Sequence, residues 1–173
     1  IFAYKIAKNL KVKENIIITS LNKFKGLPHR QEIVFSTKKL LCINDSKATS
    51  FDASLQPLSN FNNIYWIVGG LPKYQDRFYL KKVKKRVIKA YIIGKNTSFF
   101  KKQIKKNIPF SISNNLKNAV NHIYTDLKSD KNLKPTILFS PAAASFDQFV
   151  NFEIRGDYFK TLVIKKFKKR FNV

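Results

Sequence analysis

The chain of 173 residues contains no methionine and only one cysteine, Cys42. A single cysteine excludes a disulfide within the chain and fits a reducing compartment such as the cytoplasm. No stretch approaches the roughly 18 consecutive apolar residues of a membrane-spanning helix, and residues 1–10 lack a signal-peptide cleavage pattern. Because residue 1 is not methionine, we expect the chain to be a piece of a longer protein or a gene remnant.

Acidic residues are scarce: 10 Asp and Glu stand against 34 Lys and Arg, which gives a net charge of +24. Such a charge is typical of proteins that bind nucleic acid or another anionic surface. The lysines accompany many Asn, Ile and Phe, a composition expected from AT-rich codons. The chain has no zinc-finger spacing, RNP-like aromatic motif or helix-turn-helix pattern. We favour biased composition and expect no specific nucleic-acid partner, with a basic nucleic-acid-binding module as the alternative.

Apolar residues make up 44% of the chain, enough to bury a core. After residue 30, runs of β-favouring residues alternate with helical patterns, which predicts an α/β fold: a Rossmann-like, mostly parallel sheet with helices on both faces. The predicted strands are 32–35, 40–43, 64–68, 87–93, 108–112 and 136–140. The predicted helices are 1–10, 14–24, 51–58, 98–105, 114–127 and 146–169. Lysine clusters at 81–86, 101–106 and 165–170 are also assigned to helices.

The stretch 137–159 holds the densest pattern. An apolar strand ends at Ser140-Pro141, because proline has no amide donor and restricts the residue before it. Ser145 and Asp147 are good helix N-caps, so backbone amides there could hold an anion. Aromatic residues recur at 146, 149 and 152, which predicts a helix with one apolar face beginning at the first of them. A packed helix without a ligand is the open alternative.

Polar residues follow two of the predicted strands, where ligands collect in open α/β sheets. Asp45 could orient a ribose hydroxyl or a water, Lys47 could neutralise phosphate, and Thr49 could donate to a carboxylate. An ordinary capping loop is the alternative. The second strand ends at Gly69-Gly70, where backbone can approach a ligand, with Lys73 three residues beyond.

A stiff turn lies at 26–30. Glycine and proline fix its course, and Arg30 presents a guanidinium fork that suits phosphate. From the pattern alone, His29 is a turn residue rather than a catalyst. No phosphate loop of the form G-x-x-x-x-G-K-[ST] occurs in the sequence.

Four sequence motifs, taken in their order along the chain, resemble those of the Mur ligase family. The stretches are GLPHR at 26–30, INDSKAT at 43–49, GGLPK at 69–73 and SPAAASFDQFVNFEIRG at 140–156. Two departures are visible: Ala143 stands where the family usually has cysteine, and Ser50 where asparagine is common. The resemblance covers essentially the whole chain.

The resemblance implies a Rossmann-like C-terminal domain at 26–173, preceded at 1–25 by the helical tail of a central ATP-binding domain. Within the family, the chain resembles the members that join D-glutamate to UDP-N-acetylmuramoyl-L-alanine in peptidoglycan synthesis. These enzymes use ATP and Mg²⁺ and pass through an acyl phosphate. By the same resemblance we expect a monomer that is inactive alone, since the phosphate loop and most magnesium ligands would lie in absent domains.

The resemblance also assigns residues, all of which bind or position a substrate. It assigns no certain catalytic residue and no metal ligand to this chain. Those expected to position ATP are His29, Arg30, Asp45 and Lys47. Those expected to bind D-glutamate are Thr49, Lys73, Ser145, Phe146 and Phe152. Because Thr49, Lys73 and Ser145 each follow a predicted parallel strand, we expect them to converge on one pocket.

Overall fold

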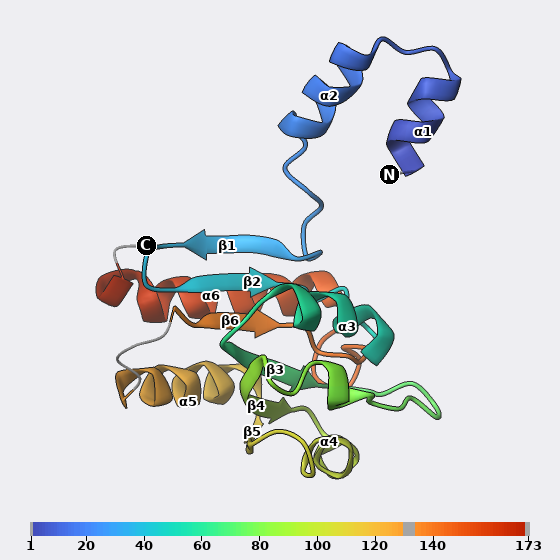
Figure 1. Cartoon of the computed structure of the whole chain (residues 1–173). Coiled ribbons are helices and arrows are strands. Elements are labelled where there is room, and N and C mark those ends of the chain that lie inside the picture. Colours follow the sequence, from blue (N-terminus) through green and yellow to red (C-terminus); the bar gives the residue numbers. More distant parts are fainter. Residues whose placement is uncertain (1, 130–133, 172–173) are drawn as a thin grey trace.

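A computed structural model of the chain (Figure 1) describes residues 2–129 and 134–171. Its centre is a six-stranded sheet in the order β1-β2-β6-β3-β4-β5. The strands are β1 (Glu32–Ser36), β2 (Leu41–Asn44), β3 (Ile64–Gly69), β4 (Val87–Ile93), β5 (Phe110–Asn114) and β6 (Thr136–Phe139). Only β1 runs antiparallel, paired with β2, and every other pair is parallel. The predicted α/β, Rossmann-like fold is confirmed.

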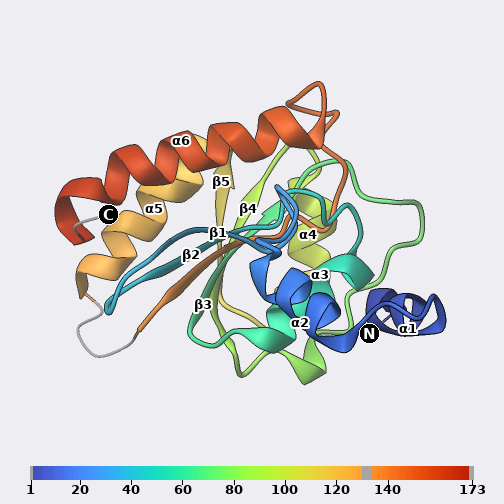
Figure 2. The ribbon, with the colours of Figure 1, turned by 90° about the horizontal axis from the view of Figure 1, so that it is seen from above.

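Helices cover both faces of this sheet (Figure 2). One face packs against α3 (Phe51–Asn60) and α4 (Thr97–Ile104), and the other against α5 (Leu116–Ser129) and α6 (Phe152–Phe171). Side chains alternate along each strand, so Trp66 of β3 enters the first core while Ile67 enters the second. Both faces are buried, which explains why the parallel strands read as continuous apolar runs.

The single cysteine lies inside the second core. Cys42 in β2 has no solvent exposure, and its burial raises the pKa of the thiol well above the usual range. A thiol in this position behaves as a small apolar side chain.

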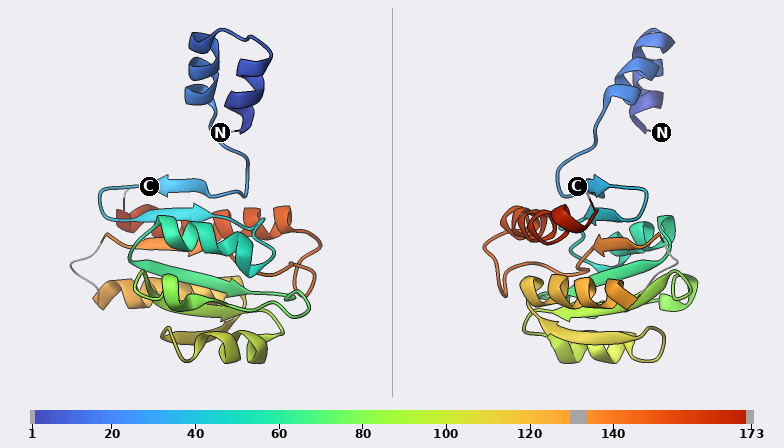
Figure 3. Two further views of the ribbon diagram at one scale, coloured as in Figure 1. Left: turned by 45° about the vertical axis from the view of Figure 1, so that its right-hand side comes forward. Right: turned by 90° about the vertical axis from the view of Figure 1, so that its left-hand side faces the viewer.

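The first two helices, α1 (Phe2–Asn9) and α2 (Glu14–Lys23), stand away from the sheet (Figures 1 and 3). Both were predicted from the sequence. On α1 no residue is buried, and on α2 only Ile17 is. The large apolar side chains exposed on and after these helices are Phe2, Ile6, Leu10, Val12, Ile16, Ile18, Leu21, Phe24 and Leu27. The predicted domain boundary at residue 25 coincides with the segment that joins this helical pair to the sheet, and it stays a prediction.

The prediction of a helix from Phe146 onward is wrong. Residues 140–151 form turns and bends, and α6 begins at Phe152. The carbonyl of Ser145 accepts hydrogen bonds from the backbone N–H of Gln148 and Phe149, which closes a short turn that does not propagate. The helix is capped instead by Asn151, whose Oδ1 accepts from Ile154 N at 2.8 Å. Phe146 is 70% exposed, so the aromatic spacing does not mark a helix face.

The lysine cluster at 81–86 is also misassigned. A 3-10 helix spans only Leu80–Lys82, and turns continue to the start of β4. Val83 is fully buried there, so the segment is anchored by its apolar residues and exposes its lysines. Among the described residues, no helix is long and apolar enough to cross a membrane.

Candidate functional site at the carboxyl edge of the sheet

Three adjacent parallel strands, β2, β6 and β3, end at the same edge of the sheet, and the loops after them lie together. The loops after β3 and β6 are joined by a backbone bridge in which Leu71 and Ala144 exchange hydrogen bonds of 2.9 Å. Gly70 lies beside it with φ +139°, and a Cβ there would overlap the carbonyl oxygen of Ala144. This close approach requires glycine.

Asp45, which follows β2, is a buried carboxylate at this edge. Its Oδ1 accepts from Gln31 N at 3.1 Å, and its Oδ2 accepts from the Ser140 hydroxyl at 2.7 Å. Burial raises the pKa of Asp45 to about 6, although both hydrogen bonds and the charge of Arg30 act to lower it. The carboxylate therefore ties the turn before β1 to the end of β6.

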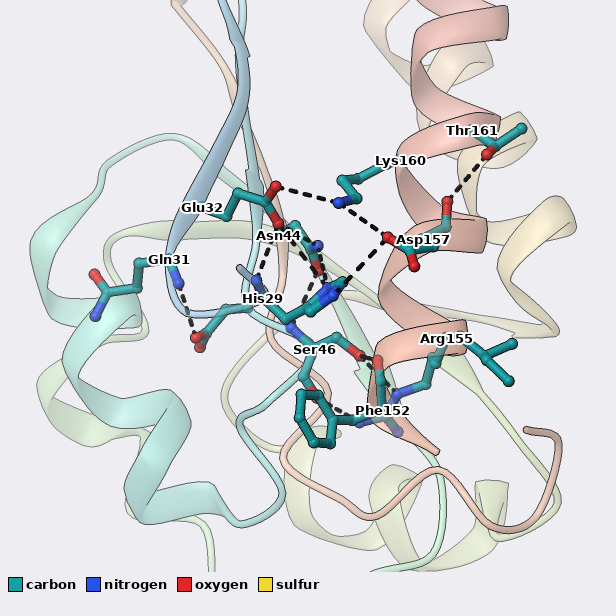
Figure 4. Close-up of polar contacts among 12 residues, drawn as sticks. His29, Gln31, Glu32, Asn44, Ser46, Phe152, Arg155, Asp157, Lys160 and Thr161 are labelled. Atoms are coloured by element: carbon teal, nitrogen blue, oxygen red, sulfur yellow. Dashed lines mark hydrogen bonds and ion pairs between the residues drawn. The ribbon is translucent and has the colours of Figure 1, made fainter. Parts of the chain in front are cut away.

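The His29 ring is buried beside the same turn (Figure 4). The Asn44 amide donates to Glu32 Oε2 and accepts from Ser46 N, which fixes its Nδ2 as the donor facing His29. Nδ1 of His29, 3.0 Å from that Nδ2, is therefore the acceptor. The ring proton then lies on Nε2, which faces Asp157 Oδ1 at 3.9 Å. Both ring nitrogens of His29 therefore face side chains of the protein itself.

Charged groups connect this turn to α6 (Figure 4). Lys160 Nζ lies 3.2 Å from Glu32 Oε1 and 2.9 Å from Asp157 Oδ1. Partial burial acts to raise the pKa of Glu32, but hydrogen bonds from His29 N and Lys160 outweigh it and lower that pKa. The turn at 26–31 is thus fastened to the first turns of α6.

Two residues predicted for different substrates meet at the start of α6. The ammonium of Lys47 lies 3.8 Å from the centre of the Phe152 ring, a cation–π contact. The rings of His29 and Phe152 are nearly perpendicular, at 81°, with their centroids 5.9 Å apart. Arg30, by contrast, is exposed. Two residues predicted to position the nucleotide, His29 and Lys47, therefore adjoin one predicted to bind D-glutamate, Phe152.

Arg155 is a buried charge that sequence reasoning missed. It is 1% exposed, and its Nε donates to Ser46 Oγ at 3.1 Å. Its Nη2 donates to the carbonyl oxygens of Ser46 at 2.7 Å and of Ala143 at 3.0 Å, whereas the buried Nη1 has no hydrogen-bond partner among the described residues. Burial lowers its pKa to about 10. No pattern in the sequence marks this arginine as buried, because it lies among other charged residues of a predicted helix.

The predicted D-glutamate residues reach the edge by different routes. Lys73 is exposed and lines a cavity of about 280 Å³, whose other lining residues are Ser50, Asp52, Tyr74, Gln75, Asp76, Arg77 and Tyr79. Thr49 and Ser145 do not line this cavity, and Ser145 is only 2% exposed. A single pocket shared by all three stays a prediction.

The side-chain polar groups of Thr49, Lys73 and Ser145 make no hydrogen bond or ion pair within residues 2–129 and 134–171. Polar groups at the edge of an α/β sheet that have no partner of their own are available to a ligand. Over the same described ranges, no three His, Cys, Asp or Glu side chains group as a metal site.

Comparisons with known proteins give a consistent picture. No family model matches the chain. Three curated proteins named UDP-N-acetylmuramoylalanine--D-glutamate ligase are similar to it. The relative from Agrobacterium fabrum is 43% identical over 148 residues, that from Brucella abortus (strain 2308) 46% over 149, and that from Rhizobium johnstonii 40% over 148. Each match covers 86% of this chain and 32% of the relative.

The resemblance read from the motifs is therefore confirmed by the comparisons. The chain spans about a third of the length of the curated relatives that it matches.

Proposed function

We propose that a chain this similar to UDP-N-acetylmuramoylalanine--D-glutamate ligases is the D-glutamate-binding part of such a ligase, acting in peptidoglycan synthesis together with a remainder that holds ATP. The observation that carries the proposal is the set of unpaired groups on Thr49, Lys73 and Ser145 at the carboxyl edge of adjacent strands. In the proposed reaction, ATP phosphorylates the alanine carboxylate of UDP-N-acetylmuramoyl-L-alanine. The amine of D-glutamate then attacks the acyl phosphate and displaces phosphate.

The task of this chain is to orient D-glutamate. A dicarboxylate needs a cation and neutral donors, which the Lys73 ammonium and the hydroxyls of Thr49 and Ser145 supply. Phe152 and the exposed Phe146 border the same region. Orientation of a nucleophile in this way contributes by proximity rather than by bond chemistry.

The nucleotide lies on the other side of Phe152 in this proposal. Lys47 and Arg30 are cations that would hold phosphate oxygens, and the buried Asp45 and His29 would fix the turn that carries Arg30. When bound, ATP supplies the phosphoryl group that activates the alanine carboxylate as an acyl donor. As the family resemblance implies, magnesium is assigned in this proposal to the remainder of the protein.

The test is a chimera in which the 149 residues of this chain that match the Brucella abortus relative replace their counterpart in it. Phosphate release that depends on D-glutamate and UDP-N-acetylmuramoyl-L-alanine is the readout. Lys73→Ala is expected to raise the KM for D-glutamate about tenfold to a hundredfold and to leave that for ATP nearly unchanged, because one charge-assisted hydrogen bond is lost.

Lys85→Ala is the matched control, since Lys85 is an exposed lysine before β4, at the opposite edge of the sheet. It should change neither constant. An active chimera in which both variants raise the KM for D-glutamate equally would contradict the proposal.

A further inference from the structure

Arg155 carries a buried positive charge that has no carboxylate in direct contact in the described structure. It forms no ion pair within residues 2–129 and 134–171, and its three hydrogen bonds go to neutral oxygens. The negative charge of Asp147 attracts Arg155 without forming an ion pair with it. Asp147 Oδ2 instead accepts a hydrogen bond from Lys95 N. An unpaired charge is expensive to bury, and an unmade buried hydrogen bond adds to that cost. The Cζ atom of Arg155 lies 5.7 Å from the centre of the Phe139 ring, a cation–π contact that offsets part of this cost but supplies no counter-charge.

The position of this charge is specific. Arg155 holds Ser46 in the loop after β2 and Ala143 in the loop after β6. Its Nη1 would lie 3.3 Å from a Cβ placed on Gly70, in the loop after β3. The guanidinium therefore lies beneath the three loops that carry the free groups of Thr49, Lys73 and Ser145.

We propose that Arg155 is a positioning residue that supplies the second positive charge of the amino-acid site, balanced when a dicarboxylate binds. The inference rests on the proposed function, because it takes the ligand to be D-glutamate. A dicarboxylate carries two negative charges, and hydrogen bonds from neutral donors balance neither of them. Lys73 provides one counter-charge at the surface, Thr49 and Ser145 are neutral, and Arg155 provides the other from below.

The charge should count for affinity because it is buried. Buried charges are screened far less by salt than exposed ones. One unit charge acting across about 8 Å at an effective dielectric constant of about 20 changes a binding constant roughly 10- to 50-fold.

The experiment measures D-glutamate binding to the 173-residue chain by calorimetry. Arg155→Gln keeps an amide donor but removes the charge, and Arg155→Lys keeps the charge but loses the planar fork. We expect Arg155→Gln to weaken D-glutamate binding at least tenfold and Arg155→Lys to retain most of it. Lys85→Gln removes one charge at the opposite edge and should leave the affinity unchanged. Equal losses in the two Arg155 variants would mean that only the hydrogen bonds matter, which overturns the inference.

A second measurement needs no variant. In the wild-type chain with ¹⁵N-labelled arginine, the guanidinium signals of Arg155 should shift as D-glutamate is added, because the bound carboxylate supplies the counter-charge that Arg155 lacks in the free chain. Signals that stay unchanged at saturating D-glutamate overturn the inference even if the variants fail to fold. Binding of D-glutamate with normal affinity by Arg155→Gln overturns the inference alone, whereas a wild-type chain that does not bind D-glutamate overturns the proposed function with it.

Discussion

Asp45 shows how one side chain can link two distant parts of the chain. It receives a backbone N–H from Gln31 and a hydroxyl from Ser140, and Ser140 is itself fixed because its carbonyl oxygen accepts from Trp66 Nε1 at 2.7 Å. The sequence pattern correctly placed Asp45 directly after a strand. It could not predict the burial that controls the charge of this carboxylate, because that burial depends on residues far away in the chain.

At this scale we predict that Asp45 makes stability depend on pH. The folded-state pKa of about 6 exceeds the unfolded value, so the folded chain binds the extra proton. The resulting stability is fully present below about pH 4 and is lost as the pH rises through about 6. Relative to Asp45→Asn, the wild type should lose roughly 2–3 kcal/mol of unfolding free energy between pH 4 and pH 7.

Urea unfolding of both proteins across this pH range provides the measurement. Glu32, Asp126 and Asp157 have lowered pKa values, so the stability that they contribute is lost as the pH falls. Both proteins contain these groups, and subtracting one pH profile from the other therefore isolates the contribution of Asp45. A difference that does not change with pH would show that the buried carboxylate does not titrate in this range.

Arg155 marks the limit of residue-level prediction. Its sequence context, between Ile154 and Gly156 in a helix with many charges, gives no sign that it turns inward. Its partners are two carbonyl oxygens and a hydroxyl contributed by loops that lie 109 and 12 positions away in the sequence. Only the assembled sheet brings them together.

At the scale of elements, the strands were predicted well because parallel strands buried on both faces leave continuous apolar runs. The predicted range 87–93 coincides with β4. The start of α6 was placed too early because a three-residue spacing of aromatics resembles a helix face. The structure shows that capping by Asn151 and a short turn at Ser145 decide where the helix begins.

The helix α6 approaches the turn at 26–31 only because Gly156 has no side chain. A Cβ at Gly156 would overlap the His29 ring and come within 3.1 Å of Asn44 Nδ2. We therefore predict that Gly156→Ala lowers the unfolding free energy by about 1–3 kcal/mol. In an ordinary helix interior, the same change would stabilise by roughly 0.5–1 kcal/mol.

A double-mutant cycle in chemical denaturation tests the cause. Glycine is the suitable replacement at position 29, because His29 has φ +61° and glycine adopts that conformation without strain. Gly156→Ala should cost much less in the His29→Gly background than in the wild type. An equal cost in both backgrounds would exclude the histidine ring as the source of the destabilisation.

At the scale of the whole molecule, the fold class followed from the alternation of strands and helices and from the motif order. The helical pair before residue 25 could be predicted as helices but not placed, since its exposed apolar faces find no cover in the described structure. In the proposed ligase, the remainder of the protein would cover those faces.

We predict that residues 26–173 fold without this pair. Because α1 and α2 stand away from the sheet, deletion of residues 1–25 should shift the melting temperature by no more than about 2 °C and should reduce self-association. Calorimetry and light scattering on the two proteins check these outcomes. A large drop in the melting temperature would show that the pair belongs to the same cooperative unit as the sheet.

The lone cysteine in β2 is a built-in probe of local unfolding. Cys42 has no exposed surface, and the neutral thiol that burial favours is a poor nucleophile. A thiol reagent therefore reacts only with molecules in which the core around β2 has opened. The labelling rate, compared with that of the unfolded chain, reports the free energy of this opening under native conditions and at a single atom. Any ligand that closes the carboxyl edge would slow that reaction in proportion to its occupancy.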